Sequence, residues 1–200
     1  MDKIRLNSME KLTGLSKFKT AVFISGTGSN FKNLIKFSKI KKSPISINLV
    51  ISNTHSAKGL IYADQYKIKK KIFNFKNFKK TEKDILTLLK KEKISFICLA
   101  GFMKILSKNF IKKFNGKIIN IHPSLLPRYK GLNTHQKAIT NKDDFSGCTV
   151  HYVTEKIDTG KIIMKKRVKL AAKDTPVSLA KKVLKQEHKL YPAAIMKIFN

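Results

Sequence analysis

The sequence predicts a doubly wound α/β fold, in which a mostly parallel sheet carries helices on both faces. Short apolar segments rich in β-branched residues alternate with amphipathic segments along the chain. Residues 95–100 (SFICLA) are almost wholly apolar, as expected for a parallel strand that is covered on both faces. The 200 residues suffice for one domain with a sizeable core. We expect a flexible extension at residues 1–18, starting at Met1 or Met9, and a single domain at residues 19–200.

The first half of the chain is expected to form four strands, each followed by a helix. Apolar and β-branched side chains run together in the predicted strands, at residues 20–25, 45–51, 68–75 and 95–100. Apolar side chains recur at helical spacing in the predicted helices, at residues 29–40, 57–66, 81–91 and 107–114. Thr81 is the expected N-cap of the third helix.

The second half is expected to add three strands and a long final helix. The strands are predicted at residues 117–121, 148–153 and 161–170, and the helix at residues 175–196, with Thr175 as its N-cap. Ligands of doubly wound sheets bind beyond the carboxyl ends of the strands. This rule selects three loops for a functional site, at residues 26–30, 101–106 and 120–131.

The chain is strongly basic, with a formal net charge of +31. All but three of its 43 basic residues are lysines, and these are scattered along the sequence. Arginine is the residue preferred for bidentate contacts with phosphates and bases, so a sequence-reading surface should contain more of it. We therefore interpret the charge as compositional drift and expect no specific nucleic-acid partner. A noncatalytic, lysine-rich nucleic-acid-binding protein is the alternative from a different functional class.

Several features favour a cytoplasmic protein without a membrane span. No apolar run approaches the roughly 20 residues that cross a bilayer, and residues 1–18 lack the apolar core of a signal peptide. Cys98 and Cys148 lie in apolar segments, where buried thiols are expected. No close-spaced set of histidines and cysteines resembles a zinc site, and we therefore expect no metal.

Two of the selected loops carry groups suited to binding and catalysis. Residues 25–30 (SGTGSN) join a strand to a helix, where backbone N–H groups and the helix dipole attract anions such as a phosphate monoester. A glycine turn that only reverses the chain is the competing interpretation. Asn120 and His122 alternate on one strand and therefore face the same space, as an amide donor and an imidazole suited to acyl transfer.

Asp158 is one of only 12 carboxylates in the chain. If it folds against His122, its charge favours the imidazolium and raises the pKa of that histidine. An ordinary turn residue is the competing interpretation. The other histidines, including His135 on a helix and His151 on a strand, are weaker candidates.

These segments resemble the glycinamide ribonucleotide formyltransferases of purine biosynthesis. The resemblance rests on FISGTGSNFKNLI from Phe23, LAGFMKILS from Leu99, NIHPSLLPRYKGLNTHQKAI from Asn120, GCTVHYVTEKIDTGKII from Gly147 and QEHKLYP from Gln186. It covers about residues 20–192, in order and with compatible spacing. The fold that it implies is the Rossmann-type formyltransferase fold.

The resemblance also implies roles for individual residues. The implied catalytic residues are Asn120, His122 and Asp158, and the implied phosphate site is Gly28, Ser29 and Asn30. Glu187 is expected to hold the glycinamide end of the substrate. The implied folate pocket comprises Met103, Lys104, Ile105 and Leu106, together with Asn120, and a further folate contact at Lys79 or Lys80 stays open.

The reaction implied is direct transfer of the formyl group of 10-formyltetrahydrofolate, a co-substrate, to the amine of 5-phosphoribosylglycinamide. Asn120 and a protonated His122 would stabilise the developing oxyanion, and the protein would act as a monomer or homodimer. The alternatives within the same chemistry are methionyl-tRNA formyltransferase and formyltetrahydrofolate hydrolase. Each is expected to carry a further domain, which 200 residues do not accommodate.

Overall fold

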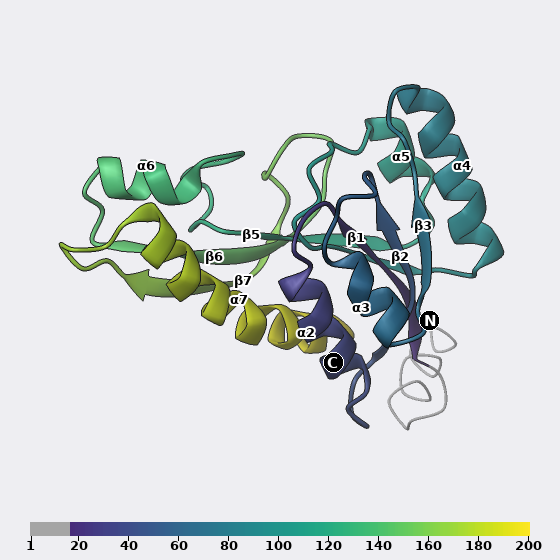
Figure 1. Ribbon diagram of the computed structural model, residues 1–200, viewed down its shortest axis with the longest axis horizontal. Helices are drawn as coiled ribbons and strands as arrows, with labels where there is room; N and C mark the ends of the chain where they lie inside the picture. Colours follow the sequence, from purple (N-terminus) through teal and green to yellow (C-terminus); the bar gives the residue numbers. More distant parts are fainter. Residues whose placement is uncertain (1–16) are drawn as a thin grey trace, which may run out of the picture.

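The computed structural model describes residues 17–200, which form a seven-stranded sheet with helices on both faces (Figure 1). The strands are β1 (Phe18–Ile24), β2 (Ile45–Ser52), β3 (Lys69–Ile72), β4 (Phe96–Leu99), β5 (Lys117–His122), β6 (Phe145–Tyr152) and β7 (Ile162–Lys169). The helices are α2 (Ser29–Ser38), α3 (Leu60–Gln65), α4 (Phe78–Lys91), α5 (Lys108–Lys113), α6 (Thr134–Thr140) and α7 (Pro176–Phe199). The predicted doubly wound architecture is confirmed.

The strand order, β3-β2-β1-β4-β5-β6-β7, places the loops after β1 and β4 side by side. Strands β1 to β5 run parallel, β6 is antiparallel to β5, and β7 is antiparallel to β6 and so has the direction of β1 to β5 again. The chain moves outward from β1 to β3 and then returns to β4, which creates a crevice at the carboxyl ends of these strands. The N–H of Ser25 donates to the carbonyl of Gly101 at 3.1 Å and joins the two loops there.

The core lies on both sides of the sheet, and β1 shows how the sequence builds it. Val22 and Ile24 pack on the face covered by α2, α3 and α7, whereas Ala21 and Phe23 pack on the face covered by α4 and α5. All four side chains are fully buried. A central strand that is covered on both faces must be apolar at every position, which explains the continuous run in the sequence.

The helix caps differ in part from those expected. The side chain of Asn77, and not that of Thr81, caps α4 by accepting a hydrogen bond from the N–H of Lys80. Thr81 instead donates to the carbonyl of Asn74 at 2.7 Å, inside the first turn. The predicted cap of α7 is confirmed, because the Thr175 side chain accepts from the N–H of Ser178.

The first strand begins earlier than the sequence predicts. Strand β1 begins at Phe18, which pairs with Ile45 of β2, two residues earlier than the sequence predicts. Residues 1–16 of the expected extension lie outside the described residues. Within residues 17–200, none of the helices has the length and apolar character to cross a membrane.

Candidate active site

A cavity of about 1050 Å³ lies at the carboxyl ends of the central strands, where the predicted loops converge. Its walls come from residues 101–106, 120–123, 131–136, 153–154 and 156–158, from His151, from the first half of α7, and from Asn30 of α2. The cavity therefore lies where the rule for doubly wound sheets places a ligand. Within residues 17–200, no group of three histidine, cysteine, aspartate or glutamate side chains could hold a metal ion.

Strands β5 and β6 bring the predicted amide and imidazole together. Asn120 and His122 are two residues apart on β5, and both line the cavity. Antiparallel pairing places His151 of β6 directly opposite Asn120. The Asn120 amide nitrogen lies 3.3 Å from Nε2 of His151, so the two strands share a polar contact at the cavity wall.

His122 is almost fully buried, with 5% of its surface exposed, and both of its ring nitrogens have oxygen partners. Nε2 donates to the carbonyl of Tyr129 at 2.8 Å. Nδ1 lies 3.3 Å from Oδ2 of Asp158, as the sequence-based pairing of these two residues requires. The ring is held from two sides, which fixes its plane.

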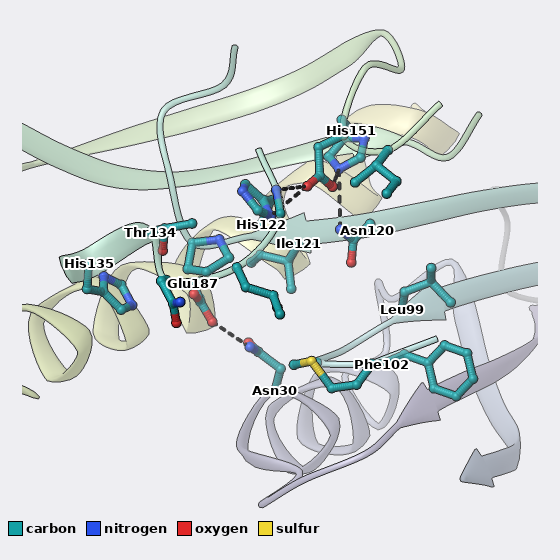
Figure 2. A pocket seen from close by; sticks show the side chains of 18 of the residues that line it. Asn30, Leu99, Phe102, Asn120, Ile121, His122, Thr134, His135, His151 and Glu187 are labelled. Atoms are coloured by element: carbon teal, nitrogen blue, oxygen red, sulfur yellow. Dashed lines mark hydrogen bonds and ion pairs between the residues drawn. The ribbon is translucent and has the colours of Figure 1, made fainter. Parts of the chain in front are cut away.

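His151, which the sequence analysis treats as a weaker candidate, also lines the cavity. Its Nδ1 donates to the carbonyl of Tyr152 at 2.8 Å, and its Nε2 lies 3.4 Å from Oδ1 of Asp158. Asp158 therefore lies between the imidazoles of His122 and His151, both of which are labelled in Figure 2. The signal that could have found His151 is the β5–β6 register, which the sequence alone does not provide.

Asp158 occupies a strained turn that faces the loop after β5. Its backbone has a φ of 50°, in the left-handed region that side chains with a Cβ disfavour. The N–H of Gly131 donates to its Oδ2 at 2.8 Å. This bond joins the turn after β6 to the loop after β5 and keeps the carboxylate directed at the histidines.

The pKa of His122, which lies beside Asp158, is shifted in the direction opposite to that predicted. Burial lowers the pKa of His122 below its ordinary value, and the Tyr129 carbonyl and the Asp158 carboxylate oppose this effect only in part. The predicted contribution of Asp158 has the right sign, but the predicted net increase in pKa is wrong. For Asp158, burial favours the protonated form, yet hydrogen bonds from His151 and Gly131 and the charge of His122 hold its pKa below the usual range.

Asn30 and Glu187 form a second polar contact, which Figure 2 shows apart from the histidine cluster. The Asn30 amide of α2 donates to Oε2 of Glu187 on α7 at 2.6 Å. Both side chains are buried and line the cavity. Burial raises the pKa of Glu187, and the bond from Asn30 opposes this rise. The side-chain amide oxygen of Asn30, Oδ1, is buried without a partner among the described residues, so it can accept a hydrogen bond from a ligand.

The glycine turn before α2 lies outside the described lining of the cavity. Of the three residues expected to bind phosphate, Asn30 lines the cavity, whereas Gly28 and Ser29 are absent from its described lining. Gly28 has a φ of 72°, and a Cβ there would lie 2.5 Å from Cα of Gly59, so packing alone requires this glycine. No side chain caps α2, which leaves its first N–H groups open to an anion.

The loop at residues 101–106 forms the apolar wall of the cavity. All four residues of the expected folate segment line it, with Met103 62% and Ile105 60% exposed, and Leu106 buried. The loop is fastened at both ends. The N–H of Met103 donates to Ser25 Oγ at 2.8 Å, and that of Ser107 donates to the buried Glu82 carboxylate at 2.7 Å.

Lys104 is the charged residue of the expected folate segment, and it lines the cavity as well. Lys79 and Lys80 are not among the described residues of its lining, although the sequence left a contact there open.

Comparison with known proteins places this arrangement in a family. Residues 18–195 match the family described as formyl transferase. The chain belongs to the formyl transferase family. It is 41% identical over 180 residues to the phosphoribosylglycinamide formyltransferase of Haemophilus influenzae, and the match covers 88% of this chain and 85% of that protein.

Longer formyl transferase relatives and solved structures agree with this assignment. The chain is 43% identical to the human trifunctional purine biosynthetic protein adenosine-3, over 90% of its own length but only 18% of the human protein. It therefore spans less than a fifth of that relative. A crystal structure of phosphoribosylglycinamide formyltransferase from Brucella melitensis superposes with a TM-score of 0.87 at 41% identity, covering 92% of this chain and 96% of the other.

Proposed function

We propose that the protein transfers the formyl group of 10-formyltetrahydrofolate to the amine of 5-phosphoribosylglycinamide. The products are formylglycinamide ribonucleotide and tetrahydrofolate, in de novo purine biosynthesis. The observation that carries the proposal is the group of Asn120, His122 and Asp158 at the cavity, with His122 buried, in a chain that is 41% identical to a protein named for this reaction.

Two sets of residues fit the two substrates. The open N–H groups of Gly28, Ser29 and Asn30 at the start of α2, next to the part of the cavity wall that Asn30 forms, suit a phosphate monoester, and Glu187 offers a buried acceptor for the glycinamide end. The apolar side chains of Met103, Ile105 and Leu106 suit the flat ring of the folate, with Lys104 beside them.

The Asn120 amide is oriented to stabilise negative charge on the formyl oxygen. The amide nitrogen lies 3.3 Å from Nε2 of His151, a ring that is held by its Nδ1–H donating to the carbonyl of Tyr152. This contact keeps the NH2 group of Asn120 at the cavity wall. An N–H of this group can then donate to the oxygen that becomes negative when the amine attacks the formyl carbon.

His122 and Asp158 handle the proton of the reaction. The attacking amine loses one proton and the leaving folate nitrogen gains one. Because burial lowers its pKa, His122 is mostly neutral at pH 7 before the substrates react and can take up a proton as charge develops. The ionised Asp158 stabilises the imidazolium and orients a water, and His122 then protonates the leaving nitrogen. No covalent intermediate with the protein is needed.

The proposal is tested by following the loss of the folate formyl group, with and without the ribonucleotide. We expect turnover that depends on the ribonucleotide and that falls by about a thousandfold in His122→Ala, as for loss of a general acid–base group. His55→Ala, at an exposed histidine outside the cavity, is the matched control and should be fully active. Turnover without ribonucleotide would instead indicate a hydrolase, and a folded protein without turnover would favour the binding-protein alternative.

We also propose a compartment, a set of partners and an oligomeric state for the protein. We expect a cytoplasmic protein with no membrane and no specific nucleic-acid partner, acting as a monomer or homodimer without a metal. Sedimentation of the purified protein at two salt concentrations, alone and with duplex DNA, checks the oligomeric state and nucleic-acid binding. Tight, steeply salt-dependent binding would contradict this setting.

A further inference from the structure

Tyr129 occupies an unusual position beside the candidate active site. Its carbonyl accepts the hydrogen bond from Nε2 of His122 at 2.8 Å. A carbonyl oxygen has no proton to give, so Nε2 must carry the hydrogen. Nδ1, which faces Asp158 at 3.3 Å, is therefore the ring nitrogen that gains and loses the proton. The Tyr129 carbonyl thus decides the tautomer of His122.

The backbone of Tyr129 needs to be held in order to present this carbonyl. Its φ is 54°, in the left-handed region that bulky side chains disfavour. Such a conformation persists only where the surroundings impose it. The tyrosine hydroxyl donates to Oδ2 of Asp143 at 2.8 Å and accepts from the amide of Asn141 at 2.8 Å. These bonds fix the far end of the side chain.

Asp143 is well placed to act as the fixed end of this arrangement. Its side chain is only 6% exposed, and its own N–H donates to the carbonyl of Ala138 at the end of α6. Arg128 closes the carboxylate from the solvent side at 2.7 Å, with 59% of its own side chain exposed. The carboxylate thus connects α6 to the loop that carries Tyr129.

We propose that Tyr129 and Asp143 are positioning residues for His122. The Asp143 carboxylate holds the Tyr129 hydroxyl, the held side chain maintains the left-handed backbone, and that backbone presents the carbonyl that fixes the proton on Nε2 of His122. The inference rests on the proposed function, because it assigns these residues a part in the proton transfer of that reaction.

Loss of the hydrogen bond between the Tyr129 hydroxyl and Asp143, which we call the anchor of Tyr129, has a chemical consequence. If the Tyr129 backbone relaxes, Nε2 loses its acceptor in a buried site, and the tautomer with its proton on Nδ1, donating to Asp158, becomes competitive. That tautomer has no lone pair on Nδ1 to take up the proton beside Asp158. The catalytic step should therefore slow, while the residues that bind the two substrates are untouched.

The test compares Tyr129→Phe and Asp143→Ala with wild type in heteronuclear NMR of the imidazole nitrogens, with His122 assigned through His122→Gln. The same variants are assayed for formyl transfer. We expect the Nε2–H form of His122 to lose its dominance in both variants. We expect kcat to fall about tenfold, with KM for both substrates within a factor of two.

Two further variants make the test specific. Asp143→Asn keeps an oxygen that can accept from the tyrosine hydroxyl, and it should restore most of the tautomer signal and of kcat. Arg128→Ala removes the exposed partner of Asp143, which also donates to the Tyr129 hydroxyl at 3.2 Å, but it keeps the Tyr129–Asp143 bond and should therefore change both readouts much less than Asp143→Ala does.

The proposal would be overturned if the imidazole nitrogen chemical shifts of His122 in Tyr129→Phe and Asp143→Ala matched those of the wild type. This holds whether or not kcat fell, because Tyr129 and Asp143 would then have a structural role at most. The NMR readout needs no turnover. If the wild-type protein showed the Nε2–H form but no formyl transfer, the proposed function would fail while the anchor remained.

Discussion

The two walls of the cavity are built in opposite ways. On the β5–β6 wall, His122 and His151 are buried, and the nitrogens of both rings have oxygen partners within 3.4 Å. On the wall formed by residues 101–106, Met103 and Ile105 expose about 60% of their surface to the cavity and solvent. The polar groups of the β5–β6 wall are paired within the protein, whereas the wall formed by residues 101–106 has exposed apolar surface that a bound ligand would cover.

This difference indicates that one wall serves catalysis and the other serves ligand binding. Groups that stabilise a transition state are most effective when the protein holds them in place beforehand, because no reorganisation is needed during the reaction. Apolar surface that becomes buried on binding supplies affinity instead. Substitutions on the β5–β6 wall should therefore act on kcat, and substitutions in the loop at residues 101–106 should act on KM for the folate.

The largest effect is expected from His122→Ala. This change removes the imidazole that we propose moves the proton, and kcat should fall by about a thousandfold, which is within the usual range for a general acid–base group. KM for both substrates should change little, since the residues that we propose bind the phosphate and the folate are other side chains. Steady-state kinetics with each substrate varied in turn measures both quantities. A large rise in KM with kcat preserved would place His122 in binding.

Asp158→Asn should give the next largest effect and also a defined pKa change. The carboxylate opposes the lowering of the His122 pKa by burial, so its removal should lower that pKa further. We expect kcat to fall by about a hundredfold, because the imidazolium loses its stabilising charge. NMR titration of His122 in both proteins checks the sign. An unchanged or higher pKa in the variant would remove Asp158 from this role.

Ser29→Asp tests the anion site at the start of α2. A carboxylate at this helix N-terminus would occupy or repel the position proposed for phosphate, so KM for the ribonucleotide should rise about tenfold, with the folate KM unchanged. Thr87→Asp, on the exposed face of α4, controls for the added charge. Equal KM values in the two variants would contradict the assignment of Gly28, Ser29 and Asn30.

Met103→Ser should give the smallest effect. Removing part of the apolar surface that a folate would bury should cost about 1 kcal/mol, equivalent to about a fivefold higher folate KM, with kcat unchanged. Ile40→Ser, at a comparably exposed position outside the cavity (55% against 62% for Met103), is the matched control. A fall in kcat for Met103→Ser would mean that this loop takes part in the chemistry.

The sequence predicts the features that depend on local pattern. Strand–helix alternation is enough for the parallel core, and alternation along β5 is enough to place Asn120 and His122 on one face. The pairing of His151 with Asn120 depends instead on the β5–β6 register, and the anchor of Tyr129 depends on a turn far along the chain. The pKa of His122 was misjudged because the sequence shows its charged partner but not the extent of its burial.

The division of labour between the two walls is tested most directly by single-turnover formyl transfer with both substrates saturating. Asp158→Asn and Met103→Ser are compared with wild type. We predict that Asp158→Asn slows the single-turnover rate by about a hundredfold and that Met103→Ser leaves it unchanged, because saturation removes binding effects. Equal slowing of the two variants would contradict the account, since both walls would then act on the same step.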